Sequence, residues 1–282
     1  MCMPYKVFRQ YCIPQHILTR FGGWLSNRRW RWWKNWQINY FINRYQVDIK
    51  SALEEDIQAY PTFNSFFTRL LKPEARPIVS GNTQIACPVD GSISQMGHIQ
   101  DHSLFQAKGF YFNLTELLGG FEKVAALFQE GEFATLYLSP KDYHRVHMPI
   151  DGTLRETIFV PGRLFSVNQQ TVNSVPALFA RNERLICLFD TAIGPIAVIL
   201  IGAMIVGSIN TVWGNTIKSK RLLKQVFQDN PIHLKKGDEL GHFKLGSTVI
   251  LLFPKNKICW EPSLQEKSTV QMGQLVAESR AY

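Results

Sequence analysis

The sequence predicts an α+β protein, in which a sheet-dominated, largely antiparallel domain follows N-terminal amphipathic helices. Beyond about residue 80, short apolar runs such as "ATLYLSP" and "STVILLFP" alternate with Gly, Pro and Asn turns, a pattern typical of non-parallel strands. Before residue 60, bulky apolar residues recur at helical spacing instead. The 282 residues are 45% apolar, which is enough to bury a large core and excludes a disordered chain.

The first 60 residues are basic and rich in aromatic side chains. The net charge of the chain is +9, and no acidic residue precedes Asp48. In "WLSNRRWRWWKNW", residues 24–36, tryptophan alternates with arginine and lysine. Apolar residues flank this stretch at helical spacing: Ile17, Leu18, Phe21, Leu25, Ile38, Phe41, Ile42 and Tyr45. The pattern favours helices at a membrane surface, where aromatic rings lie among headgroups and basic side chains meet anionic lipid. Stacking on nucleic acid and a helical hairpin docked on its own domain are the alternatives.

A junction follows this helical region. "YPTFNSFFTRLLKPEARPI" predicts an aromatic-rich helix from about Asn64 that ends at Pro73, with an extended exit through Pro77. We therefore expect a membrane-association region over residues 1–60 and a second domain over residues 61–282. Few helices are expected in the second domain: a pair in "LTELLGGFEKVAALFQ" and one more in "QQTVNSVPALFARN".

One apolar segment approaches the length of a membrane-spanning helix. "AIGPIAVILIGAMIVGSI", residues 192–209, is nearly uncharged, but Gly and Pro interrupt it and its β-branched residues come in two bursts. We predict two consecutive buried strands or one long bent strand. The five cysteines are scattered and never form C-x-x-C, and no secretory signal pattern opens the chain. These features predict a reducing, cytoplasmic environment.

Several polar residues do not fit a simple core. Asp90 in "PVDG" by itself indicates a turn. His144 and His147 in "SPKDYHRVHMPIDG" share one face of a helical turn but lie on opposite faces of a strand. A metal site needs further ligands, and no second His/Cys cluster has suitable spacing, so we predict no metal. The isolated histidines are expected at the surface or as hydrogen-bonded core residues: His98, His102, His233 and His242.

The step Gly246-Ser247-Thr248 opens the apolar run "VILLF". The plain interpretation is a bend at Gly246 followed by the start of a strand. Asp90, His147 and Ser247 also occur in an order that a hydrogen-bonded triad allows, although Ser247 lacks the G-x-S-x-G elbow of hydrolases. A serine directly after glycine can attack the preceding carbonyl with little steric obstruction, which permits an acyl shift within the chain.

Taken together, "LGST", "DYHRVHMPIDG" and "PVDG" resemble the phosphatidylserine decarboxylases of the bacterial membrane-associated type. Supporting stretches include "FNSFFTRLLKPEARPI", "QAKGFYFNLTELLG", "GAMIVGSI" and "KKGDELGHFKLGST". The resemblance covers roughly residues 60 to 255, and the N-terminal region matches by its basic, aromatic character.

The resemblance implies a proenzyme that cleaves itself between Gly246 and Ser247. The products are a β chain of residues 1–246 and an α chain of residues 247–282, and Ser247 becomes a pyruvoyl group. Asp90, His147 and Ser247 are then the charge relay of self-cleavage, and His144 assists decarboxylation or supplies a proton. The pyruvoyl group forms a Schiff base with phosphatidylserine, which loses carbon dioxide and gives phosphatidylethanolamine. Neither pyridoxal phosphate nor a metal is implied.

The same resemblance implies partners and a location. The expected partners are phosphatidylserine, an anionic membrane surface, and the cleaved chains themselves as a heterodimer or a homodimer of such pairs, without nucleic acid. We expect peripheral attachment to the cytoplasmic face of the cell membrane, without a spanning helix. Two other classes stay open at this point: a serine hydrolase that uses Ser247, His147 and Asp90 on an intact chain, and a lipid-surface or nucleic-acid binding protein.

Overall fold

The computed structural model describes residues 4–204, 209–214, 219–243 and 247–280. Its helical segments are α1 (Tyr5–Cys12), α2 (Gln15–Ser26), α3 (Arg31–Tyr45), α4 (Phe63–Phe67), η1 (Pro73–Ala75), α5 (Leu114–Leu117), α6 (Glu122–Ala125), η2 (Ala126–Phe128), α7 (Gln169–Val172) and α8 (Leu178–Arg181).

Its strands are β1 (Gln84–Ala86), β2 (Gly91–His98), β3 (Ser103–Ala107), β4 (Phe110–Asn113), β5 (Glu132–Leu138), β6 (Arg145–His147), β7 (Gly152–Val160), β8 (Arg184–Thr191), β9 (Gly194–Ile201), β10 (Ile209–Thr211), β11 (Leu223–Val226), β12 (Ile232–Leu234), β13 (Glu239–Phe243), β14 (Ser247–Phe253), β15 (Ile258–Trp260), β16 (Thr269–Val270) and β17 (Leu275–Ser279).

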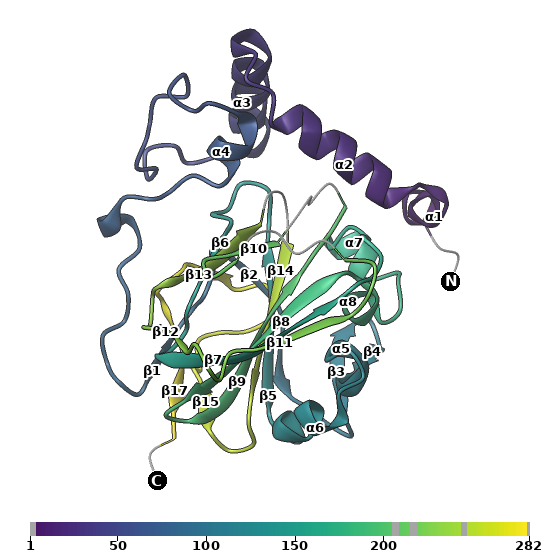
Figure 1. Ribbon diagram of the computed structural model, residues 1–282, viewed down its shortest axis with the longest axis vertical. Helices are drawn as coiled ribbons and strands as arrows, with labels where there is room; N and C mark the ends of the chain where they lie inside the picture. Colours follow the sequence, from purple (N-terminus) through teal and green to yellow (C-terminus); the bar gives the residue numbers. More distant parts are fainter. Residues whose placement is uncertain (1–3, 205–208, 215–218, 244–246, 281–282) are drawn as a thin grey trace.

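A nine-stranded antiparallel sheet forms the centre of the molecule (Figure 1). Its order is β11-β7-β8-β9-β14-β5-β2-β16, and β12 pairs with β7 beside β11. Two three-stranded sheets, β1-β17-β15 and β10-β13-β6, and the hairpin β3-β4 accompany it. All pairings between named strands in the described ranges are antiparallel, which confirms the predicted α+β, sheet-dominated class.

The strand β14 lies in the interior of the large sheet. It pairs with β9 on one side and β5 on the other, and all seven of its residues are buried. A strand covered on both faces has a continuous apolar sequence instead of an alternating one, which explains "VILLF". The first burst of the run 192–209 forms β9, as expected, and β10 begins at its last residue, Ile209; most of the second burst, residues 205–208, lies outside the described residues. Over the residues that the structure describes, no helix is both long and apolar enough to cross a membrane.

The helices α1, α2 and α3 form a layer over one end of the large sheet (Figure 1). Side-chain amides of this layer bind the domain below: Gln15 Oε1 accepts from Leu164 N at 2.8 Å and Gln10 Oε1 from Ser166 N at 2.9 Å. The helix α3 contributes Ile38 to a second, smaller apolar cluster with residues of α4 and the preceding loop. The layer is therefore attached by hydrogen bonds at α1 and α2, by apolar packing of Val7 in the main core and of Tyr11 on Phe165, and by apolar packing of α3 in the smaller cluster.

The helix α4 is shorter than the sequence predicted. A capping box between Thr62 and Ser65 starts it, as the T-x-x-S spacing allows, but it ends at Phe67 instead of continuing to Pro73. Beyond it, the carbonyl of Leu70 accepts from Leu53 N at 2.8 Å. This pairing with the loop before α4 takes the backbone groups that a longer helix would have used. The stretch "QQTVNSVPALFARN" likewise holds two short helices, α7 and α8, instead of one.

Candidate active site

The candidate site lies at the end of the large sheet that faces the helical layer. Ser247 is the first residue of β14 and pairs with Leu138 of β5, while Ser92 of β2 pairs with Tyr137 on the other side of β5. Asp90 immediately precedes β2, so Asp90 and Ser247 flank the same end of β5. With strands about 4.8 Å apart, their backbones lie roughly 10 Å from each other.

Ser247 has no solvent-exposed surface, and its Oγ has no hydrogen-bond partner among the residues that the structure describes. Among the described residues, the neighbouring hydroxyl Thr248 Oγ1 is also buried without a partner. Leaving a buried polar group unpaired costs about 1–3 kcal/mol, so such groups are rare without a functional reason. Gly246, the other half of the predicted cleavage site, lies outside the described residues.

His147 is oriented by backbone groups of two other segments. Its amide donates to the carbonyl of Pro88 at 2.8 Å, and its ring Nδ1 lies 2.8 Å from the carbonyl of Gly237. A carbonyl only accepts, so Nδ1 carries the proton and Nε2 has the free lone pair, which lies 3.2 Å from the hydroxyl of Tyr143. Burial lowers the pKa of His147, which keeps the ring neutral and able to accept a proton.

Asp90 is held by partners other than His147. Its carboxylate accepts from Arg76 Nε at 2.8 Å and 3.0 Å, from Arg76 Nη2 at 2.5 Å, and from Met272 N at 2.9 Å. Neither a hydrogen bond from His147 to the Asp90 carboxylate nor one from the Ser247 hydroxyl to His147 is formed among the described atoms. Asp90 still lies close enough for its charge to raise the pKa of His147, against the larger effect of burial.

His144 lies in an apolar environment between the sheet and the helical layer. Its ring stacks on Phe67 of α4 with centroids 4.1 Å apart, and neither ring nitrogen makes a hydrogen bond of normal geometry. Burial lowers the pKa of His144 to about 3, with a further contribution from the positive charge of Arg69, while the nearby carbonyls of Ser139 and Pro140 oppose the shift. This histidine is therefore neutral at physiological pH.

Sequence reasoning missed four residues of this region. Asp142 accepts from Ser139 N at 2.6 Å, and burial raises its pKa. Asp142 and Tyr143 lie inside the quoted "DYHRVH" block, so the motif itself contained that signal. Arg69 and Arg76 come from the aromatic and proline-rich junction, where nothing in the sequence pointed to a contact with residues 90 or 144.

The isolated histidines have polar partners, among them His102, whose Nε2 lies 3.0 Å from Gln129 Nε2. His242 lies beside the site, because it pairs with Arg145 of β6 and its partner Glu239 pairs with His147. His98 Nδ1 lies 3.3 Å from Glu132, His233 Nδ1 lies 2.8 Å from Thr153 Oγ1, and His242 Nδ1 lies 3.2 Å from Glu239. Across the described ranges, no group of three or more His, Cys, Asp or Glu side chains is placed to hold a metal ion.

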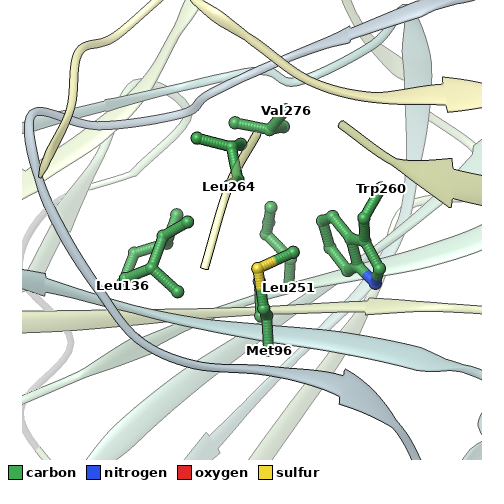
Figure 2. Close-up of a pocket in the computed structure, with 8 residues that line it drawn as sticks. Met96, Leu136, Leu251, Trp260, Leu264 and Val276 are labelled. Carbon is green, nitrogen blue, oxygen red and sulfur yellow. The ribbon is translucent and has the colours of Figure 1, made fainter. Parts of the chain in front are cut away.

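A separate apolar pocket lies under the large sheet, between β2, β5 and β14 on one side and the C-terminal segment on the other. Figure 2 shows Met96, Leu136 and Leu251 facing Trp260, Leu264 and Val276 across it. It has room for about one water molecule and offers no polar lining. It is a packing defect of the core and holds no part of the candidate site.

A serine without exposed surface fits an enzyme precursor that acts on its own chain better than a hydrolase that attacks external esters. Comparison with known proteins identifies the particular family. The sequence profile described as "Phosphatidylserine decarboxylase" matches residues 63–278, and one described as "PSD" matches residues 5–46. The chain belongs to the phosphatidylserine decarboxylase family, whose members are pyruvoyl-dependent, membrane-associated lipid enzymes.

Curated relatives extend over nearly the whole chain. The phosphatidylserine decarboxylase proenzyme of Pseudomonas putida (strain GB-1) is 56% identical over 277 residues, 96% of each chain. The protein of the same name from Pseudomonas fluorescens (strain Pf0-1) is 54% identical over 280 residues, 98% of each chain. That from Ectopseudomonas mendocina (strain ymp) is 53% identical, over 97% of this chain and 98% of its own. The resemblance found in the sequence motifs is thus confirmed.

Proposed function

We propose that Ser247 is the source of the pyruvoyl group with which this member of the family decarboxylates phosphatidylserine to phosphatidylethanolamine and carbon dioxide. The observation that carries the proposal is the Ser247 hydroxyl, fully buried and without a hydrogen-bond partner at the start of an interior strand. The plain interpretation, a serine that only opens a strand, gives no reason for burying an unpaired hydroxyl there.

Self-cleavage follows from the chemistry of the Gly246-Ser247 bond. The Ser247 oxygen adds to the Gly246 carbonyl carbon, the C–N bond breaks as the nitrogen takes a proton, and an ester replaces the amide. Removal of the Ser247 α-proton then expels the Gly246 carboxylate and leaves a dehydrated residue. That residue takes up one water and loses ammonia, which leaves a ketone. The products are the chains 1–246 and 247–282.

The histidine His147 is the proposed base for the Ser247 hydroxyl. The Gly237 carbonyl fixes the Nδ1–H tautomer, which is the orienting task that a carboxylate performs in a serine–histidine–aspartate triad. Asp90 then completes the charge relay because its negative charge acts on His147 without a hydrogen bond, and Arg76 fixes the position of the Asp90 carboxylate. The Tyr143 hydroxyl must turn away from Nε2 before that atom can accept the serine proton.

In decarboxylation, the pyruvoyl group supplies the electron sink into which the electrons of the breaking carbon–carboxylate bond move. His144 is proposed to assist decarboxylation or to supply the proton to the carbon left behind; because its ring is neutral, it can donate that proton only after accepting one, and the substrate ammonium, which loses a proton when the amine condenses, is the source. The neutral ring of His144 and its apolar surroundings, with Phe67 stacked on one face, exclude water from competing for that carbon.

The cleaved chains are expected to stay together as a heterodimer. The segment from residue 247 contributes β14 to the interior of the large sheet, β16 to its edge beside β2, and β17 to the sheet with β1. Breaking one peptide bond removes none of these ladders. A homodimer of such pairs stays a prediction.

The helical layer is the proposed means of attachment to the cytoplasmic face of the membrane, with residues 61–282 as the decarboxylase domain. Large side chains exposed on α1, α2 and α3 include Tyr5, Phe8, Ile17, Leu18, Phe21, Trp24, Trp32, Trp36 and Tyr40. Basic side chains lie among them, and Arg28 is stacked on Trp24 at 3.8 Å. Apolar and basic groups together on one layer favour an anionic bilayer surface.

An intact-mass spectrum tests the cleavage. The wild type is expected to give a piece of about 4 kDa for residues 247–282, blocked to Edman degradation at its first residue, whereas Ser247→Ala stays a single chain of 32.4 kDa. Ser263→Ala is the matched control, because this exposed serine lies in the same segment. An uncut chain in the wild type and in both variants would refute the proposal and revive the serine hydrolase.

Flotation with vesicles tests the attachment. Replacing Trp32 and Trp36 by Ser should lower binding to vesicles of phosphatidylglycerol and phosphatidylethanolamine by at least tenfold. Tyr111→Ser is the control, because that exposed ring lies on β4, away from the layer. Equal loss in the control, or none in the tryptophan variant, would assign attachment to another surface.

A further inference from the structure

The candidate site contains a buried arginine whose hydrogen-bonding capacity is largely unused. Arg69 is 4% exposed, and two of its guanidinium nitrogens, Nε and Nη1, are buried with no hydrogen-bond partner within residues 4–204, 209–214, 219–243 and 247–280. Within the same ranges, its Nη2 makes one long contact, 3.3 Å to the carbonyl of Lys141. A guanidinium has five N–H donors and stays charged, so a buried one without acceptors is costly unless an anion binds it.

The nearby protein carboxylates do not fill this role. Asp90 and Asp48 lie close enough to act on the Arg69 charge, but neither forms an ion pair with it. Asp90 is bound by Arg76 on two sides, and Asp48 accepts from the amide of Lys50 at 3.0 Å. Other neighbours are the ring of Phe66, 5.5 Å from the guanidinium carbon, and Tyr60, whose hydroxyl donates to the carbonyl of Glu54 at 2.5 Å.

The position of Arg69 links the proposed membrane surface to the proposed reaction centre. Arg69 lies two residues after Phe67, whose ring stacks on that of His144, and the charge of Arg69 lowers the pKa of His144. The next residue, Leu70, is exposed and hydrogen-bonded through its carbonyl to Leu53, which is also exposed. Exposed apolar side chains, the unpaired guanidinium and the buried histidine therefore follow one another from the surface inward.

We propose that Arg69 is the receptor for the phosphodiester of the lipid substrate, an assignment that rests on the proposed function. In this arrangement the acyl chains stay at the exposed leucines, the phosphate meets Arg69, and the amine reaches the position of Ser247. Arginine suits phosphate because its planar fork donates two parallel hydrogen bonds.

The chemistry favours the phosphate over the other anion of the substrate, its carboxylate. The carboxylate loses its charge when carbon dioxide leaves, so a guanidinium bound to it would stabilise the starting state more than the transition state and slow the reaction. The phosphate keeps its charge throughout. Binding it stabilises the ground state and the transition state equally, which affects KM and leaves kcat unchanged.

The test measures how strongly the processed enzyme prefers an amine that carries a phosphodiester. Wild type is incubated with glycerophosphoethanolamine or with ethanolamine, cyanoborohydride traps the amine on the pyruvoyl carbonyl, and mass spectrometry of the α chain quantifies the adduct. We expect wild type to prefer glycerophosphoethanolamine by about 10- to 100-fold, Arg69→Gln to lose that preference, and Arg69→Lys to keep part of it. Arg155→Gln, which removes an exposed arginine paired with Asp190, should behave as wild type.

The outcomes separate this proposal from the proposed function. Loss of the preference in Arg69→Gln, with normal self-cleavage and normal trapping of ethanolamine, supports a phosphate receptor. An unchanged preference in that variant, or no preference in wild type, overturns it. If Arg69→Gln does not fold, Arg69→Lys decides: a preference reduced below wild type supports the proposal, and an unchanged one overturns it. Absence of the α chain and of all trapping in wild type would instead refute the pyruvoyl assignment itself.

Discussion

Two arginines are buried to almost the same degree in this molecule, and their surroundings differ completely. Arg184, at the start of β8, is 2% exposed, and Arg69 is 4% exposed. Arg184 donates to four backbone carbonyls at 2.6–2.8 Å: Glu116, Leu117, Ala180 and Asn182. Arg69 has one long contact to a carbonyl, and two of its nitrogens have no partner.

The acceptors around Arg184 explain its role. Glu116 and Leu117 end α5, and Ala180 and Asn182 lie at the end of α8, where carbonyls lack partners within the helix. The guanidinium supplies the donors that these helix ends need, and although burial lowers its pKa to about 10, it stays charged at neutral pH. The fold thus pairs four of the five donors of a buried arginine where the role is structural, which makes the unpaired donors of Arg69 meaningful.

The largest expected effect is on stability, and it separates the two arginines. Arg184→Met removes a donor from four carbonyls, of which that of Glu116 still accepts from Gly119 N at 3.0 Å, and should lower the free energy of unfolding by about 3–5 kcal/mol. Arg69→Met removes a buried charge without acceptors and should leave stability unchanged or raise it by about 1 kcal/mol. Urea unfolding of the full chain in detergent, with the Ser247→Ala background preventing cleavage, measures both. A comparable loss in the two variants would mean that Arg69 is also structural.

An intermediate effect is expected from His144, which is as buried and as unpaired as Arg69. Its pKa is about 3 in the folded state and near 6.5 in the unfolded state, so the unfolded chain binds the proton more readily. The folded state is therefore favoured in full above pH 6.5 and loses up to about 1.4 kcal/mol per unit as the pH falls toward 3.

Unfolding titrations between pH 7 and 4.5 check this dependence. His144→Phe should flatten the acid side of the stability curve by about 2–3 kcal/mol, and it keeps a ring on Phe67. His233→Gln is the control, since that histidine is exposed and should leave the slope unchanged. An unaltered slope in His144→Phe would show that other groups, His147 among them, cause the acid sensitivity.

The sheet-dominated fold could be predicted from the local sequence because the interior strands are continuous apolar runs. The apolar runs in β9 and β14 and the turn residues between them sufficed for the antiparallel class. The end of α4 was not predictable, because it depends on a pairing between Leu70 and Leu53 that has no local sequence signal. Tertiary pairing overrode the helical spacing there.

The candidate site shows the same difference between what a local sequence pattern predicts and what contacts between distant segments decide. Asp90, His144, His147 and Ser247 could be named as candidate site residues because they lie in short stretches whose combination resembles one family. The groups that hold them come from elsewhere: Arg76 binds Asp90 and the Gly237 carbonyl orients His147, 90 residues further along the chain. A backbone carbonyl has no sequence signature, so only the folded chain reveals that it occupies the place expected for Asp90.

The smallest expected effect concerns Glu183, the neighbour of Arg184 in the chain. The charge that raises the pKa of Arg184 is that of Glu116, and Glu183 has no ion-pair partner among the described residues. Burial raises the pKa of Glu183 to about 7, above the unfolded value near 4.5.

Its contribution to stability is therefore present in full below pH 4.5 and lost as the pH rises through 7, opposite in sign to that of His144. Glu183→Gln should be more stable than wild type by about 1–2 kcal/mol at pH 8 and equal to it at pH 5, in the same urea titrations. Glu122→Gln, on the exposed start of α6, should match wild type at both values. A Glu183→Gln stability curve parallel to that of wild type from pH 5 to 8 would mean that the Glu183 carboxylate is ionised in the folded chain and hydrated by water.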